Sequence, residues 1–317
     1  MTGRFSNQSM NTTTLAQSES LIGTAVPADT FILLETPQPW DKPALLSQGI
    51  PEALRQVVKP LLSAGMRVHL IANEQTSDRR RILIFQRSKP SQLRRGTPLL
   101  GKYQSWEIQV NSPADMAPAL EQFLKQNRTG WQPTLTGQRH LMICTHASHN
   151  ECCGMYGYPF YQDAIAATQK LGLTQQVHPW QISHIGGHRF APTLIDFPQG
   201  RYYGNLDQES LLCLLKQQGD IAPLLSTYRG WSLLPKPLQI LEAALLQQYQ
   251  WDWLQGQASG HILKQDQGYT WAELWFQSPK HSLRRYTAKL KNNELLSYRL
   301  ESGQRPVSAP LTHRKTG

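Results

Sequence analysis

The chain has few cysteines, and no part of it is a long apolar run. It contains 4 Cys in 317 residues, too few for the disulfide framework that stabilises small secreted domains. No apolar stretch is long enough for a membrane span, and residues 1–20 have no apolar core of the kind found in secretory signals. We therefore expect a cytoplasmic protein with reduced cysteines that are free for metal or redox chemistry.

Charge is moderate and biased to one sign. Charged residues make up 17% of the chain, and the net charge is +10. The basic residues occur in short clusters, such as Arg79–Arg81 and Arg284–Arg285, and never in a long run. This pattern favours a solvated basic face, which suits an acidic protein partner better than a nucleic acid. Hydrophobic residues at 39%, with 22 Gly and 21 Pro, also exclude a collagen, a coiled coil and a wholly disordered chain.

The sequence pattern predicts five regions and an α/β fold. The first 25 residues are rich in Ser, Thr, Asn and Gln, and such a segment buries too little surface to become ordered. The predicted regions are a disordered tail (1–25), an N-terminal α/β half (26–130), a second α/β half (138–220), a C-terminal α+β region (230–303) and a second tail (304–317).

Apolar periodicity gives both α/β halves a similar order of elements: a strand, a helix, three strands and a helix. The expected strands are 31–35, 66–71, 81–86 and 106–110 in the first half, then 140–144, 177–183, 192–197 and 201–204 in the second. The expected helices are 51–64 and 113–126, then 160–171 and 207–217. In the C-terminal region we expect a helix over 235–253 and strands over 261–264, 269–276 and 284–291.

The residues that point to chemistry lie between Cys144 and His188. Cys144 ends a predicted strand, and Cys153 follows it in a polar segment. His184 and His188 have the spacing of two ligands on one helix face, but Gly186 and Gly187 between them disfavour a helix. We therefore expect a tight loop, in which both glycines adopt positive φ and let backbone N–H groups approach an inorganic sulfide.

Two kinds of metal site use this donor set. Zinc takes two Cys and two His, but the cysteines of a zinc knuckle are usually two to four residues apart, closer than Cys144 and Cys153. Iron–sulfur clusters tolerate wider loops, and two thiolates on one iron with two imidazoles on the other form a Rieske-type ligand set. A [2Fe–2S] cluster is the main prediction, and a zinc-stapled binding module without redox activity is the alternative.

The chain also resembles the sucrase/ferredoxin-like family, whose members have a thioredoxin-like ferredoxin fold. The resemblance implies that the second half (138–220) is a thioredoxin-like iron–sulfur domain. The resemblance rests on residues 184–192 (HIGGHRFAP), on Cys144-Thr145-His146 with Cys152-Cys153, and on weaker matches at 21–25, 33–35, 39–40 and 203–206. It implies a [2Fe–2S] cluster on Cys144, Cys153, His184 and His188, with the histidines in the places of two cysteines in related ferredoxins. The loop 147–151 departs from many relatives, which have basic residues and an Asp there.

The family resemblance implies an electron carrier rather than an enzyme. A glycosidase needs two placed carboxylates, and no such pair stands out near this segment. Neutral imidazoles in place of thiolates are expected to raise the reduction potential and to couple electron uptake to proton uptake. The donor and acceptor proteins are unknown.

Several residues have an alternative role in this interpretation. Cys152 is able to replace Cys153 as a ligand in principle, although a small buried thiol is its expected role. A thiol oxidoreductase that uses both cysteines is disfavoured, because adjacent cysteines form a strained disulfide. Cys213 is expected in the core. His146 and His149 are expected to be polar loop residues, with metal-site support or ligation as alternatives.

Overall fold

The computed structural model describes residues 21–74, 79–87, 99, 101–125, 137–291, 296–300 and 308–309. The predicted N-terminal tail falls mostly on residues 1–20, which lie outside the described residues. Its last five residues do not fit that prediction. Ala25 is fully buried, and the backbone N–H of Thr24 donates to the Arg229 carbonyl at 3.1 Å. Residues 21–25 are ordered because they pack against a distant strand.

The first half forms four strands and two main helices, as its pattern predicts. The strands are β1 (Thr30–Glu35), β2 (Arg67–Ala72), β3 (Arg80–Gln86) and β4 (Gln104–Val110). The helices are α1 (Glu52–Ser63) and α2 (Met116–Lys125), with short 3₁₀ turns η1 (Ala44–Leu46) and η2 (Pro113–Asp115). Strand order is β4-β3-β1-β2, in which β1 and β2 are parallel and the other pairs antiparallel.

The second half repeats this arrangement. Its elements are β5 (Arg139–Cys144), α3 (Glu151–Lys170), β6 (Val177–Ile182), η3 (His188–Phe190), β7 (Thr193–Phe197), β8 (Arg201–Gly204) and α4 (Gln208–Lys216). Strand order is β8-β7-β5-β6, again with the β5–β6 pair parallel and the others antiparallel. The α/β prediction and the similar element order of the halves are therefore confirmed.

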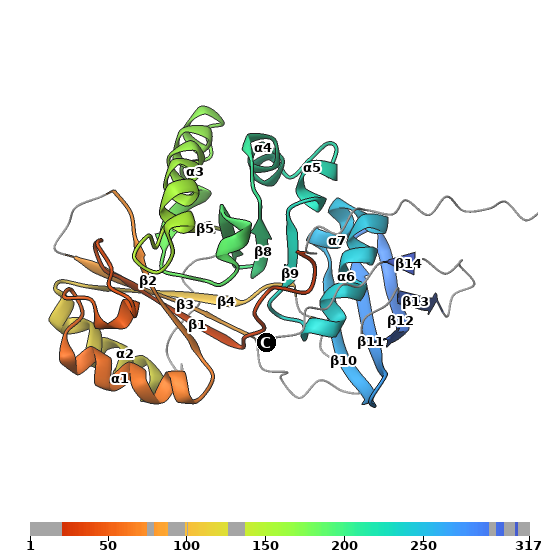
Figure 1. Ribbon diagram of the computed structural model, residues 1–317, viewed down its shortest axis with the longest axis horizontal. Helices are drawn as coiled ribbons and strands as arrows, with labels where there is room; N and C mark the ends of the chain where they lie inside the picture. The colour runs from red at the N-terminus through yellow and green to blue at the C-terminus, as the bar shows by residue number, and fades with distance from the viewer. Residues whose placement is uncertain are drawn as a thin grey trace, which may run out of the picture.

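The two halves join into one nine-stranded sheet through β2 and β6. These strands pair antiparallel at Ile71↔Ile182 and Ala72↔Gln181. The inner faces of the halves also pack together, with Phe197 of β7 stacked on Phe85 of β3 at 4.1 Å between ring centroids. Figure 1 shows α1 and α2 on one outer side of the molecule and α3 on the opposite side. The junction brings the loop after β6 close to the first half.

The C-terminal region completes the sheet and adds a second one. Its elements are α5 (Ala222–Leu225), β9 (Tyr228–Trp231), α6 (Lys236–Tyr249), α7 (Trp251–Gln255), β10 (Gln257–Gln265), β11 (Tyr269–Ser278), β12 (His281–Lys291), β13 (Leu296–Leu300) and β14 (Ser308–Ala309). Strand β9 pairs with β8 at the sheet edge, and β10 to β14 form a separate antiparallel sheet (Figure 1).

Two C-terminal predictions need correction. The helix expected over 235–253 is two helices, because Gln250 has φ of 51° and interrupts the helical backbone between α6 and α7. The expected tail 304–317 lies outside the described residues except for Ser308–Ala309, which pair with β13. Backbone pairing with a neighbouring strand orders this short segment.

Candidate metal centre

Cys144 and Cys153 meet where β5 gives way to α3. Cys144 is the last residue of β5 and is 1% exposed. Helix α3 begins at Glu151 and not near residue 160 as predicted, so that Cys153 lies in its first turn. The early start follows from Asn150, whose side chain accepts a hydrogen bond from the backbone N–H of Cys152 at 3.0 Å and caps the helix. Pro159 lies inside the helix.

The loop after β6 carries the two predicted histidine ligands. Gly186 and Gly187 have φ of 85° and 78°, in the left-handed region that favours glycine. The segment is thus a tight loop, as expected, and a 3₁₀ turn starts at His188. The chain reverses direction here, which keeps His184 near the end of β5 and moves His188 outward.

The structure brings three of the four predicted ligands together. The Sγ atoms of Cys144 and Cys153 and a ring nitrogen of His184 all lie within 4.8 Å of one another. The Sγ of Cys153 is 3.7 Å from Nδ1 of His184. His188 lies outside this group and is exposed, with its ring centroid 5.8 Å from that of His184. These three donors form a site able to hold a metal.

The two thiols have opposite pKa shifts. A hydrogen bond from Cys153 lowers the pKa of the Cys144 thiol well below its ordinary value, even though burial acts in the other direction. The same hydrogen bond raises the pKa of Cys153, and burial adds to the effect. Cys144 is therefore the thiol that first becomes a thiolate, the form that binds metal.

His146 supports His184 and is not free to bind metal itself. Its Nδ1 accepts a hydrogen bond from the backbone N–H of His184 at 3.2 Å, and its Nε2 lies 3.0 Å from the Asp41 carbonyl oxygen. Both ring nitrogens are thus engaged, with the proton on Nε2. Burial lowers the pKa of His146, which agrees with a neutral ring. This histidine fixes the backbone of the loop that carries His184.

His149 and the other cysteines occupy different positions around the site. The His149 ring stacks on the His184 ring at 3.7 Å between centroids, with planes 17° apart. Cys152 is half-buried and is not one of the three grouped donors. Cys213 lies on α4 and is buried, with its thiol directed to the Asp220 carbonyl at 3.3 Å. His149, Cys152 and Cys213 are therefore not among the three grouped donors.

One contributor to the site was not predicted from the sequence. Arg229 of β9 is 1% exposed, and its guanidinium donates to the Gly186 carbonyl at 3.0 Å. No motif or periodicity marks this arginine, because it comes close to the loop only through the pairing of β8 with β9. It therefore has to be found in the structure.

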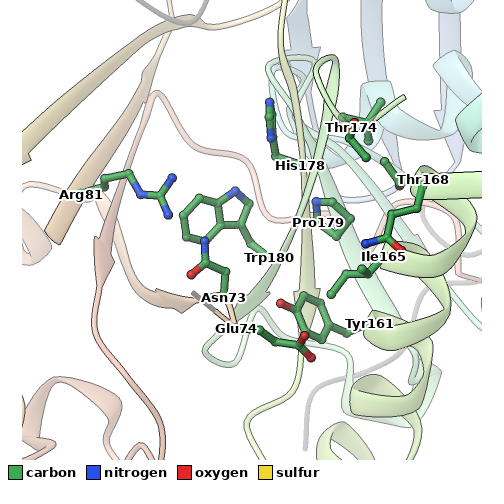
Figure 2. Close-up of a pocket in the computed structure, with 12 residues that line it drawn as sticks. Asn73, Glu74, Arg81, Tyr161, Ile165, Thr168, Thr174, His178, Pro179 and Trp180 are labelled. Atoms are coloured by element: carbon green, nitrogen blue, oxygen red, sulfur yellow. The ribbon is translucent and has the colours of Figure 1, made fainter. Parts of the chain in front are cut away.

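A separate cavity lies between α3, β6 and the end of β2. Figure 2 shows Tyr161 and Ile165 of α3 facing Pro179 and Trp180 of β6, with Arg81 of β3 beyond Trp180. The other lining residues are Asn73, Glu74, Thr168, Gln169, Thr174, Val177 and His178. The four predicted metal ligands do not line this cavity.

The donor chemistry fits the predicted groups. Two buried thiols and an imidazole are soft or borderline donors, suited to zinc or to an iron–sulfur cluster and not to Mg²⁺ or Ca²⁺. Asn150 and His146 hold the backbone of Cys152 and His184. In the part of the chain that the structure describes, no helix has the length and apolar character needed to cross a bilayer.

Comparison with known proteins identifies the family. The sequence model of the sucrase/ferredoxin-like family matches residues 21–230. This range contains both halves of the nine-stranded sheet, all four predicted ligands and Arg229. Searches of curated proteins and of solved structures find no match. Because the family match covers more than half of the chain, this protein belongs to the sucrase/ferredoxin-like family.

Proposed function

We propose that this protein is a one-electron carrier with a [2Fe–2S] cluster on Cys144, Cys153, His184 and His188. The observation that carries the proposal is the convergence of the two cysteine sulfurs and His184 within 4.8 Å. Membership of the sucrase/ferredoxin-like family supports it, and so does the tight loop that holds a second imidazole, His188, next to His184. Such a cluster, when bound, stores and releases single electrons.

The protein's own groups have distinct parts in this function. Cys144 and Cys153 provide buried anionic donors, and burial keeps water away from them. The imidazoles provide neutral donors, which is expected to give a higher potential than four thiolates would give. His188 is exposed to water, and reduction makes the metal centre more negative. We therefore expect proton uptake to accompany electron uptake.

A single zinc ion is the competing occupant. Three donor atoms within 4.8 Å suit one tetrahedral ion with an open fourth position. The protein would then be a zinc-stapled binding module without redox activity. The two functions differ in colour, in metal content and in response to a reductant.

The test is the spectrum of anaerobically purified wild-type protein. A red-brown protein with iron and acid-labile sulfide in equal amounts, and an electron spin resonance signal after dithionite, is the expected result. A colourless protein with stoichiometric zinc overturns the proposal in favour of the binding module.

Histidine-to-cysteine variants then test the ligand set. His184→Cys and His188→Cys should each keep a cluster but lower its potential and change its signal, because a thiolate replaces an imidazole. His261→Cys is the matched control, since His261 lies on β10 outside the family match. If His188→Cys leaves both the potential and the signal unchanged, His188 is not a ligand.

A further inference from the structure

Arg229 is a buried cation, and its hydrogen-bond acceptors among the described residues are neutral. Its Nε donates to Thr24 Oγ1 at 3.0 Å and its Nη2 to the Thr24 carbonyl at 3.1 Å. Its Nη1 donates to the Gly186 carbonyl at 3.0 Å. The faces of Phe190 and Tyr202 lie 5.7 and 5.5 Å from the guanidinium carbon. Each guanidinium nitrogen of Arg229 thus has an acceptor, but none of these contacts within the described residues provides a negative charge.

Arg201 on the neighbouring strand β8 shows how a buried arginine is usually paired with a carboxylate. It is 2% exposed, and its Nη1 forms an ion pair with the buried Glu242 at 2.5 Å. Within the described residues, Arg229 has no such carboxylate partner. An unpaired buried charge is costly, and burial accordingly lowers the pKa of Arg229 to about 10. A negative charge near Arg229 in the working form of the protein would offset this cost.

The position of Arg229 indicates where that charge lies. Its acceptor Gly186 is in the loop between the two predicted histidine ligands, and a Cβ on Gly187 would meet its Nη2 at 2.6 Å. A thiolate at Cys144 acts electrostatically to keep Arg229 protonated. The guanidinium thus lies against the loop of the metal site and within electrostatic reach of one of its sulfurs.

We infer that Arg229 is the counter-charge of the metal centre, which offsets the negative charge of the Cys144 and Cys153 thiolates. Metal binding fixes both thiolates in their charged form, so a nearby cation strengthens metal binding. Electron uptake adds a further negative charge, so the same cation favours reduction. The second consequence rests on the proposed electron-carrier function, whereas the first holds for zinc as well.

The first experiment uses Co²⁺ as a probe of the metal-free full-length protein. Co²⁺ bound to thiolates absorbs in the visible range, so its association constant is read from a titration. We expect Arg229→Gln to bind Co²⁺ at least about ten-fold more weakly than wild type, because charges interact strongly in a buried site. Arg229→Lys keeps the charge and should stay within about three-fold. Lys170→Gln, which removes an exposed charge at the last residue of α3, is the screened control.

The second experiment measures the midpoint potential of the iron–sulfur form. Arg229→Gln should lower the equilibrium constant for reduction by about ten-fold, which corresponds to about 59 mV for one electron. Arg229→Lys and Lys170→Gln should keep the wild-type potential. A purely structural role predicts lower thermal stability for both Arg229 variants with unchanged Co²⁺ affinity and potential, and that result overturns the inference.

A second pair of variants tests the role of Arg229 in metal binding if Arg229→Gln does not fold. Thr24→Asp places a carboxylate at the Nε contact and neutralises Arg229 in place, whereas Thr24→Asn is its uncharged match. We expect Co²⁺ to bind about ten-fold more weakly to the Asp variant than to the Asn variant. Equal affinities overturn the inference. If wild type holds only zinc, the proposed function fails, yet the Co²⁺ comparison still tests Arg229.

Discussion

Gly157 of α3 lies directly against the carbonyl oxygen of Cys144. A Cβ on Gly157 would be 1.9 Å from that oxygen and 3.0 Å from the carbonyl carbon, closer than two non-bonded atoms can approach. Only a residue without a side chain lets α3 pack this closely on the end of β5. The distance between the two cysteines therefore depends on a glycine that lies about one helical turn after Cys153.

Gly157→Ala should damage the metal site. The helix has to move away from β5, which separates Cys153 from Cys144 and costs about 3 kcal/mol in free energy of unfolding. Urea unfolding and Co²⁺ binding measure the two effects. Gly268→Ala is the control, because Gly268 has no neighbour within 4 Å of an added Cβ. Normal Co²⁺ affinity in Gly157→Ala would show that the close contact does not position the cysteines.

Cys153→Ser should abolish metal binding, whereas Cys152→Ser should leave it intact. The sulfur of Cys153 belongs to the group of three donors, and that of Cys152 does not. The measurement is iron and sulfide content after anaerobic purification, together with Co²⁺ absorption. Loss of metal in both variants would mean that Cys152 takes part in ligation, the alternative that the sequence alone leaves open.

Asn150→Ala should weaken both the helix and the metal site. Loss of this N-cap costs about 1 kcal/mol of stability, and the first turn that carries Cys153 loses its fixed start. Asp207→Ala is the matched control, because Asp207 caps α4 by accepting from Ser210 N–H at 2.8 Å. Both variants should unfold at lower urea, but only Asn150→Ala should bind Co²⁺ more weakly. If both variants weakened Co²⁺ binding equally, the Asn150 cap would have no specific role in positioning the metal site.

Acid should destabilise the fold through His140. Burial lowers the pKa of this histidine to about 3, and the nearby His178 and Arg81 act in the same direction. Its Nδ1 accepts a hydrogen bond from Trp180 Nε1 at 3.2 Å, which requires a neutral ring. The unfolded chain binds the proton near pH 6.5 and the folded chain does not, so stability is present above that pH and falls as the pH drops.

The measurement is the free energy of unfolding in urea at pH 7 and pH 5. Wild type should lose about 2 kcal/mol more than His140→Gln over this interval, since glutamine does not titrate and its amide oxygen is still able to accept from Trp180. Identical pH profiles for wild type and His140→Gln would contradict the assignment.

Local sequence signals predicted much of the fold. Apolar periodicity located the strands and helices of both halves, because burial of one face imposes that pattern on each element. It failed where local signals were weak or overridden. The sequence pattern predicted a helix start near residue 160, but the Asn150 cap starts α3 nine residues earlier. Residues 21–25 looked disordered because their order comes from Arg229 and not from their own composition.

The metal site, like the fold, was predicted from the sequence only in part. The residue types and spacing of Cys144, Cys153, His184 and His188 were enough to nominate a metal centre, since thiols and imidazoles have few other reasons to recur in that pattern. Only the tertiary structure showed that three of these donors converge while His188 lies outside the group, that His146 holds the loop, and that Arg229 lies against it. Those relationships join residues far apart in the chain, and they arise from strand pairing and close packing, which no local pattern encodes.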